Sequence, residues 1–258
     1  MNDVELVYVF LALAAFGAGY VDAVVGGGGL IQTPALLAAF PATAPATLFG
    51  TNKLASIVGT SSAAIQYARR VRVPWRLALP GAFAALVGSW YGAKVVTYLP
   101  PDLIRPFILA LLILVAIYTF IKKDFGTIGI ESRQTSSDIF KVVTIGGGIG
   151  FYDGFFGPGT GSFFIFLFVR FLQMDFLKAS VTAKILNVAT NLAAISYFAI
   201  NVEMMWLLGA MMAVANLSGA ILGSRMAIRH GAGFVRKMFL FVVSALVLKM
   251  AYDLIRAG

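Results

Sequence analysis

Four ionisable residues lie within apolar segments of the sequence and away from the edges of those segments, and they fall into two pairs of the same kind. Asp22 and Lys53 form the first pair, and Asp153 and Lys184 form the second. A charged side chain at the centre of a bilayer costs about 2.5–3.5 kcal/mol on insertion scales. Because the sequence meets this cost twice, at equivalent places, we expect these residues to serve a buried functional site.

Hydrogen-bonding residues follow each lysine at helical spacing. Positions i, i+3 and i+7 share one face of a helix. The residues with this spacing are Lys53, Ser56 and Thr60 in one segment, and Lys184, Asn187 and Asn191 in the other. Two such faces suit an oxyanion, because the ammonium groups attract it and the hydroxyl and amide donors replace its hydration shell. We therefore predict that the two faces converge on a substrate-binding site for a small anion.

Two glycine-rich breaks follow the aspartates and precede short apolar segments. Their residues are Gly26, Gly27, Gly28 and Gly29 in the first break, and Gly157, Gly159, Thr160 and Gly161 in the second. Such a break ends one helix and exposes the first backbone N–H groups of the next, which bind anions together with the positive end of the helix dipole. Pro34, in the first short segment, argues against a regular long helix there. We expect both breaks to donate N–H groups to the same site.

Each of these features also has a structural explanation. Glycine in membrane helices often permits close packing of two helices, and a lysine can extend along apolar surface to reach an interface. For Asp22 and Asp153 we favour a structural role, as caps of the break or counter-charges of the lysines, over the carriage of protons. The sequence has no cysteine and a single histidine, His230, so we expect no metal site and no cofactor.

The composition indicates a membrane protein. Hydrophobic residues make up 60% of the chain and charged residues 12%, whereas a soluble domain has about 25% charged residues. The formal charge of +9 comes from Lys and Arg at the ends of apolar segments, where the positive-inside rule places them, and not from a stripe that would bind nucleic acid. The spans contain no Ser/His pair and no His/Asp/Glu cluster of metal-ligand spacing, so we do not expect an enzyme.

The two halves of the chain match at a constant offset of 131 positions, without a gap. The matched residues include Asp22 with Asp153, Thr51 with Thr182, Lys53 with Lys184, Trp75 with Trp206, Gly88 with Gly219, and Gly92 with Gly223. One offset held over about seventy positions indicates an internal duplication.

Hydropathy predicts an all-α, polytopic membrane protein of about ten helices, five in each half. The predicted spans are 5–25, 29–40, 46–68, 75–95 and 103–121, followed by 141–156, 162–173, 178–199, 206–224 and 237–255. The second segment of each half has only about a dozen residues. It is either a short span or one arm of a re-entrant hairpin, which is tolerated where protein or a water cavity surrounds it.

Basic residues orient these spans. Lys and Arg gather at 69–76, 122–141 and 225–237, whereas the connections 41–45 and 200–205 have neither. The loops alternate correctly if the basic ones are cytoplasmic. Five spans per half then make the second half start from the opposite side, which is an inverted 5+5 repeat. The predicted parts are a first transmembrane repeat at 1–125, a cytoplasmic linker at 126–140 and a second transmembrane repeat at 141–258.

Two motifs resemble the TauE/SafE family of sulfite and organosulfonate exporters, also described as anion permeases. They are Gly19-x-x-Asp22 with Gly26 to Gly29, Pro34 and Gly50-Thr51-Asn52-Lys53 in the first half, and Gly150 to Ser162 with Ala183-Lys184 and Asn187 in the second. We count Asn52, beside Lys53, among the substrate-binding residues. The resemblance covers nearly the whole chain and implies a multi-pass carrier of the bacterial inner membrane that exports sulfite, organosulfonates or similar anions.

We therefore expect a secondary transporter in the lipid bilayer, with export as the expected direction, that moves a small anion by alternating access at a midplane site. Two alternatives stay open. One is a proton- or cation-coupled carrier of another substrate, centred on Asp22 and Asp153, and the other is an anion channel. A homodimer is compatible with so small a carrier.

Overall fold

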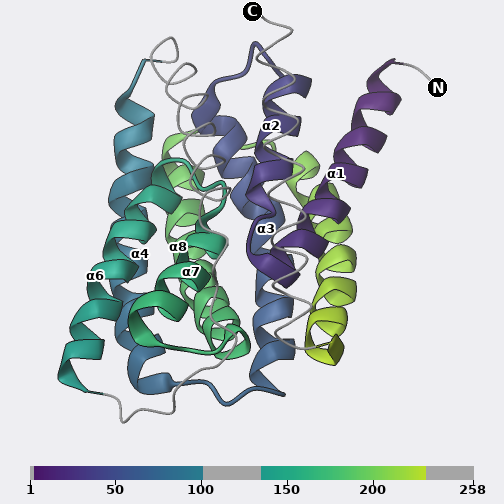
Figure 1. Cartoon of the computed structure of the whole chain (residues 1–258). Coiled ribbons are helices and arrows are strands. Elements are labelled where there is room, and N and C mark those ends of the chain that lie inside the picture. Colours follow the sequence, from purple (N-terminus) through teal and green to yellow (C-terminus); the bar gives the residue numbers. More distant parts are fainter. Residues whose placement is uncertain (1–2, 101–134, 231–258) are drawn as a thin grey trace, which may run out of the picture.

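The computed structural model describes residues 3–100 and 135–230, in which every regular element is an α-helix (Figure 1). The helices are α1 (Asp3–Val25), α2 (Gly29–Ala39), α3 (Pro45–Ala68), α4 (Trp75–Tyr98), α6 (Ser136–Phe155), α7 (Thr160–Leu172), α8 (Phe176–Asn201) and the last described helix, Trp206–His230. The predicted spans 103–121 and 237–255 lie outside the described residues. The all-α prediction is confirmed for the part of the chain that is described.

Helix α6 begins at Ser136, five residues before the predicted span 141–156 and inside the predicted linker 126–140. Its first turn is closed by a capping box, in which the Asp138 carboxylate accepts from the backbone N–H of Thr135 at 3.0 Å and the Thr135 hydroxyl accepts from the Asp138 N–H. These bonds from the backbone and side chain of Thr135 lower the pKa of Asp138. Hydropathy missed this start because the polar residues that cap a helix resemble a loop by composition.

Three described helices are long and apolar enough to cross a membrane, by length and composition: Glu5–Val25, Phe176–Asn201 and Trp206–His230. Helices α2 and α7 have 11 and 13 residues. At 1.5 Å per residue they rise about 16 and 20 Å, which is less than the hydrocarbon thickness of about 30 Å. The chain is a multi-pass membrane protein in which these two helices are too short to cross.

Each short helix turns back along the helix that precedes it. In Figure 1, α1 runs from the upper end to the middle of the molecule and α2 returns upward, whereas α6 rises from the lower end and α7 returns downward. Helix α2 packs against α1, and α7 packs against α6. The two turns of these hairpins therefore approach the interior from opposite ends.

Helix starts and helix contacts repeat at the offset of 131 positions. Helices α7, α8 and Trp206–His230 begin 131 residues after α2, α3 and α4, respectively. A Cβ added at Gly88 would collide with the backbone oxygen of Gly147, and a Cβ added at Gly219 would collide with that of Phe16. Both members of the second contact differ from those of the first by 131. Helix α4 thus packs tightly against α6, and the helix Trp206–His230 packs tightly against α1. In both cases the partner is the first described helix of the other half.

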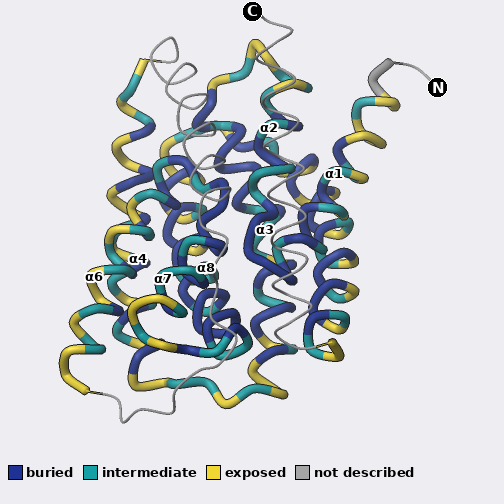
Figure 2. Tube along the Cα trace, viewed as in Figure 1, coloured by how far each residue is buried: buried dark blue, intermediate teal, exposed yellow. Residues whose placement is uncertain are grey.

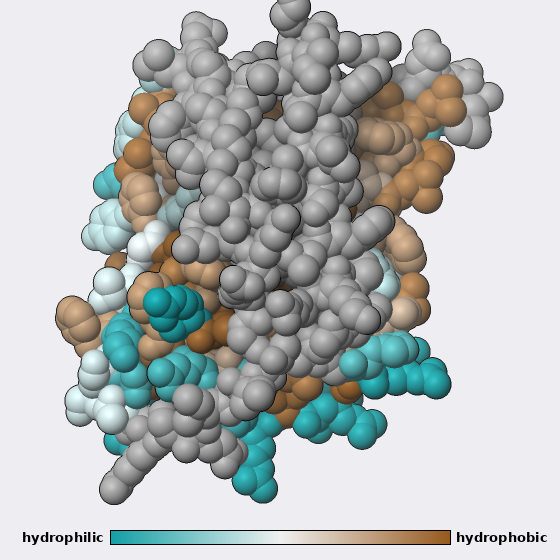
Figure 3. Space-filling view, viewed as in Figure 1, coloured by the Kyte–Doolittle hydropathy of each residue, from teal (hydrophilic) through white to brown (hydrophobic). Residues whose placement is uncertain are grey.

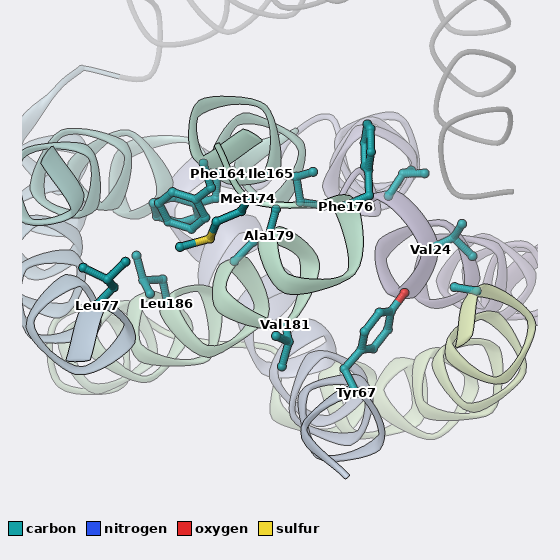
Figure 4. Packing of buried hydrophobic residues seen from close by; sticks show 14 of the residues in the cluster. Val24, Tyr67, Leu77, Phe164, Ile165, Met174, Phe176, Ala179, Val181 and Leu186 are labelled. Carbon is teal, nitrogen blue, oxygen red and sulfur yellow. The ribbon is translucent and has the colours of Figure 1, made fainter. Parts of the chain in front are cut away.

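An apolar core holds α3, α7 and α8 against the first hairpin. Figure 4 shows Val24, Tyr67, Phe164 and Leu186 within this cluster, and all four are fully buried. The Tyr67 hydroxyl donates to the carbonyl oxygen of Ala23 at 3.0 Å, so the one polar atom of the ring is satisfied. Buried positions follow the inner sides of the helices (Figure 2). This packing fixes the polar face of α3 relative to the break that ends α1.

The outer surface is largely apolar, with a polar end. Large exposed hydrophobic residues include Leu13, Phe83 and Leu207. Figure 3 shows hydrophobic side chains along the right flank and hydrophilic ones gathered at the lower end, where α3 ends and α4 begins in Figure 1. The basic connection 69–76 lies there. This distribution suits lipid around the flanks and charged loops at an interface.

Close packing predicts different outcomes for two glycines of α1. A Cβ at Gly19 would meet backbone atoms of Asn216, whereas a Cβ at Gly17 would meet nothing within 4 Å. Because forced overpacking costs about 1–3 kcal/mol, we expect Gly19→Ala to lower the midpoint of thermal unfolding and Gly17→Ala to leave it unchanged or raise it. Unfolding of the purified variants in detergent, followed by tryptophan fluorescence, measures both midpoints. Equal midpoints for the two variants would contradict the close approach of the helices.

Candidate functional site

A small buried cavity lies where the two glycine-rich breaks meet α3 and α8. Its volume is about 20 Å³, and its lining residues are Asp22, Gly26, Gly29, Asn52, Lys53, Ser56, Thr60, Asp153, Gly157, Gly159, Thr160, Gly161, Asn187 and Asn191. Every one of these residues belongs to the set that the sequence predicted. The structure therefore brings together, in one place, both breaks and both polar helix faces.

The two breaks contact each other directly. Gly26 and Gly157 have positive φ angles of 78° and 96°, which only glycine adopts without strain, and they hold equivalent places in the two halves. A Cβ at Gly26 would collide with the backbone of Gly161. Ser162 joins the breaks, because its N–H donates to the Gly26 oxygen at 3.1 Å and its hydroxyl donates to the Val25 oxygen at 2.8 Å. The first turn of α7 is thereby fixed against the end of α1.

This arrangement exposes backbone donors to the cavity. Gly29 and Gly161 lie in the first turns of α2 and α7 and line the cavity. Among the described residues, no acceptor takes the N–H group of either one. The first N–H groups of a helix have no partner within the helix and carry the positive end of its dipole. Two helix N-termini, one from each half, thus adjoin the same small space.

Lys53 contributes the ammonium group of the cavity. It lies on α3, and its Nζ forms an ion pair of 2.6 Å with Oδ2 of Asp153, which lies on α6 in the other half. The two side chains are 4% and 2% exposed. Removing either member of a buried pair of this kind leaves an uncompensated charge in the interior. An anion that enters the cavity must therefore share the ammonium group with Asp153.

Lys184 does not line the cavity, contrary to the prediction from the sequence. Its Nζ donates to the backbone oxygen of Asp22 at 2.8 Å and lies 5.4 Å from the centre of the Tyr67 ring. The reason is that the Asp22 carbonyl, near the end of α1, and the Tyr67 ring bind the ammonium group of Lys184 outside the cavity. The carboxylate of Asp22 instead accepts from the Thr60 hydroxyl at 3.0 Å. Each lysine thus contacts the aspartate residue of the other half, but by different atoms.

Gly27 and Gly28 also lie outside the lining. A Cβ at Gly28 would meet the backbone of Ala18 and the Cβ of Asp22, which marks a packing position. At Gly27 the nearest atom would be the Ser162 hydroxyl oxygen, at 3.5 Å. The structure therefore supports close packing at Gly28, leaves room for a side chain at Gly27, and places neither glycine against the cavity.

Two further polar residues, which were not predicted from the sequence, form a chain of hydrogen bonds that ends on the backbone of Asn52. The Asn216 amide donates to the side-chain oxygen of Gln32 at 3.0 Å, and the Gln32 amide donates to the backbone oxygen of Asn52 at 3.4 Å. Asn52 is 5% exposed, and its own side-chain oxygen has no hydrogen-bond partner among the described residues. Gln32 and Asn216 have no polar counterpart 131 positions away. The signal in the sequence is a polar residue within an apolar helix, but neither residue is repeated in the other half.

A larger groove lies elsewhere and has a different character. Its volume is about 660 Å³, and it runs between the second half of α3 and the helix Trp206–His230. Arg69 and Arg225 are its charged residues, and it contains none of the predicted site residues. The charged pair, the helix N-termini and the buried amides all belong to the small cavity, so we take that cavity as the candidate site.

The crossing of the breaks predicts contrasting effects at two adjacent glycines. Gly26→Ala places a side chain in a left-handed backbone conformation, at about 1–2 kcal/mol, and against the backbone of Gly161. Gly27→Ala adds a methyl group that meets no atom closer than 3.5 Å. We expect Gly26→Ala to lose most of its folded yield and all substrate-induced thermal stabilisation, and Gly27→Ala to keep both. Size-exclusion profiles and thermal shifts measure this. A folded Gly26→Ala variant with the native thermal shift would show that the crossing is not needed for the site.

Comparison with known proteins assigns the family. The family described as Sulfite exporter TauE/SafE matches residues 11–250. The chain is 38% identical over 244 residues to the probable membrane transporter protein ORF9 of Sinorhizobium sp, which covers 95% of this chain and 92% of that protein. It is 35% identical to the probable membrane transporter protein YfcA of Escherichia coli K12, covering 94% and 89%. A probable membrane transporter protein of Haemophilus influenzae is 31% identical, covering 94% of each chain.

No solved structure matches the chain. The family match spans nearly the whole chain, and relatives matched over about nine-tenths of their own length are named probable membrane transporter proteins. These findings agree with the all-helical fold and with the apolar helices described above. The chain therefore belongs to the TauE/SafE family of membrane transporters and is not an enzyme.

Proposed function

We propose that the chain is a secondary transporter of a small anion, such as sulfite or an organosulfonate, and that the anion binds in the cavity between the two breaks. The observation that carries this proposal is the buried Lys53 ammonium, set among hydrogen-bond donors from both halves. Asn187 and Asn191 are each at least nine-tenths buried, whereas the Thr160 hydroxyl already donates to the Gly157 oxygen at 2.7 Å. Donors held in such a dry place replace the hydration shell of an oxyanion, and the Lys53 ammonium attracts it.

The cavity size favours a carrier over a channel. A cavity needs about 10–15 Å³ to hold one water molecule, so about 20 Å³ admits little more than that. An oxyanion of four or more heavy atoms requires the hairpins to separate. A site that must open to bind, and that lies between two hairpins from opposite ends, suits alternating access. A channel would instead need a continuous path for the ion.

The architecture we propose is an inverted repeat of about ten helices, with repeats at 1–125 and 141–258 joined by a cytoplasmic linker at 126–140. The repeated helix starts and the glycine contacts at equivalent positions support it. The opposite directions of the two hairpins in Figure 1 support the inversion. The basic connections 69–76 and 225–237 then face the cytoplasm of a bacterium, with the protein in its inner membrane.

The substrate class has two sources of support. The family name refers to sulfite export, and the donor set of the cavity suits a compact oxyanion. The relatives are named only as probable membrane transporters. In the proposed site, Lys53 supplies the charge, and Ser56 and the two asparagines supply hydrogen bonds, whereas the Thr60 hydroxyl donates to Asp22. Lys184 does not contact the anion in this proposal and acts through its hydrogen bond to the backbone of Asp22.

Flux into sealed vesicles that contain the purified protein tests this function. We expect sulfite or a sulfonate to enter protein-containing vesicles faster than protein-free ones, to saturate, and to exchange with unlabelled anion inside. A panel of sulfate, carboxylates and phosphate defines the class. Single-channel currents in a planar bilayer would favour the channel, and absence of saturable flux for every anion in the panel would overturn the proposal.

A further inference from the structure

The charged groups around the cavity balance one another. Asp22, Asp153 and Lys53 line it, and Lys184 contacts the backbone of Asp22 from behind. Counted at their formal charges, two carboxylates and two ammonium groups give a site with no net charge. A neutral site of this kind does not favour an added anion, because a monoanion would leave a negative charge buried within the membrane, where uncompensated charge is costly. A positive charge must therefore enter the site together with the anion.

The two carboxylates are held differently. Asp153 has its ion pair with Lys53 at 2.6 Å and is 2% exposed. The carboxylate of Asp22 accepts a hydrogen bond from the neutral hydroxyl of Thr60. Among the described residues it has no ion pair, because Lys184 binds the backbone oxygen of Asp22 and not its carboxylate. Asp22 is also less buried than Asp153. Of the two carboxylates, Asp22 is therefore the one that can be neutralised without breaking an ion pair.

We propose that each monoanion crosses the membrane together with one proton and that Asp22 carries this proton. The inference rests on the proposed function and deepens it. A proton on Asp22 removes one negative charge and leaves the ammonium of Lys184 uncompensated, so the site becomes attractive to an anion. Anion and proton bind from the same side and both leave on the other, so a proton gradient directed into the cell drives uptake and not the export expected from the sequence. The loaded site and the site before loading have the same net charge.

The groups that face Asp22 fit this role. On α3 these are Lys53, Thr60 and Tyr67, on α8 Lys184, and on α6 Asp153. The hydroxyl of Tyr67 donates to the Ala23 oxygen, so it does not provide a proton to Asp22. A sodium ion is a less suitable companion, because it requires a set of oxygen ligands of its own in addition to the donors that bind the anion. A proton requires no such set.

The test uses methanesulfonate, which stays anionic throughout the physiological pH range, so the substrate itself cannot carry the proton. Vesicles containing the full chain hold a pH-sensitive dye, and labelled methanesulfonate is added outside. With one proton per anion, a gradient of one pH unit, acidic outside, supports about a tenfold accumulation. We expect this accumulation, acidification of the vesicle interior, and no effect of a potassium diffusion potential or of replacing sodium by choline.

Two variants separate the coupling from the transport. Asp22→Asn mimics the protonated carboxylate, so we expect it to retain exchange of methanesulfonate across the membrane but to lose the tenfold accumulation and the acidification. Glu203→Gln makes the same change at an exposed carboxylate outside the cavity, and it should behave like the native protein. Native flux driven by the diffusion potential without acidification, or flux that requires sodium, would overturn the coupling while the proposed function stands. No flux or exchange of any anion by the native protein would instead overturn the proposed function.

Discussion

Replacing Lys53 by methionine is expected to abolish transport and to destabilise the protein strongly. The change removes the ammonium of the cavity and leaves Asp153 buried without its partner at 2.6 Å. Loss of one member of a buried ion pair costs about 3–5 kcal/mol. We expect anion flux to fall by at least about a hundredfold, since about 3 kcal/mol of binding energy corresponds to such a factor. Flux in vesicles and the unfolding midpoint in detergent measure the two effects.

A lysine elsewhere provides the control. Lys94 lies on α4 and is exposed, so Lys94→Met also removes one ammonium group but leaves no buried carboxylate behind. We expect it to keep the flux and the unfolding midpoint of the native protein. If Lys53→Met transported at the native rate, Lys53 would not be a substrate-binding residue, whatever its effect on stability.

The combination of Lys53→Met with Asp153→Asn is expected to recover most of the lost stability but none of the transport. The double variant has no uncompensated charge at this site, and replacing a buried ion pair by neutral groups is often neutral for stability. The anion, however, still has no ammonium group to bind. This variant separates the structural role of the pair from its role in binding, which the single variant cannot do.

Two measurements decide this second prediction. The unfolding midpoint should return close to the native value, and the thermal shift produced by sulfite or methanesulfonate should stay absent. The single variant Asp153→Asn serves as the reference, because it keeps the ammonium and frees it from its partner. Recovery of flux in the double variant would contradict a direct contact between Lys53 and the anion.

The repeated pattern of the sequence explains why so much of the candidate site could be predicted. Helix α7 begins 131 residues after α2, and α8 begins 131 residues after α3, so the breaks and polar faces that repeat in the sequence also repeat in space. Duplication makes a residue pair visible without any knowledge of the fold. For this reason the lining of the cavity contains only residues that the sequence had marked.

The features that the sequence did not predict depend on which atoms meet. Spacing places Lys184 on the same face as Asn187, but the side chain of Lys184 is bound by the Asp22 carbonyl and the Tyr67 ring. Neither contact can be recognised from the types and spacing of residues in the sequence. Gln32 and Asn216 lie in different halves without repeated counterparts, so their hydrogen bond appears only once the helices pack. Hydropathy likewise could not decide between short spans and re-entrant arms, since both have the same composition.

The position of a bound anion tests the proposed site between the two glycine-rich breaks most directly. Crystals grown with selenite, which has the charge and shape of sulfite, permit the selenium atom to be located by anomalous diffraction. We predict one strong peak in the cavity, within hydrogen-bonding reach of the Lys53 ammonium and of the N–H groups at the starts of α2 and α7. A selenium peak confined to the groove at Arg69 and Arg225, with none between the two glycine-rich breaks, would contradict it.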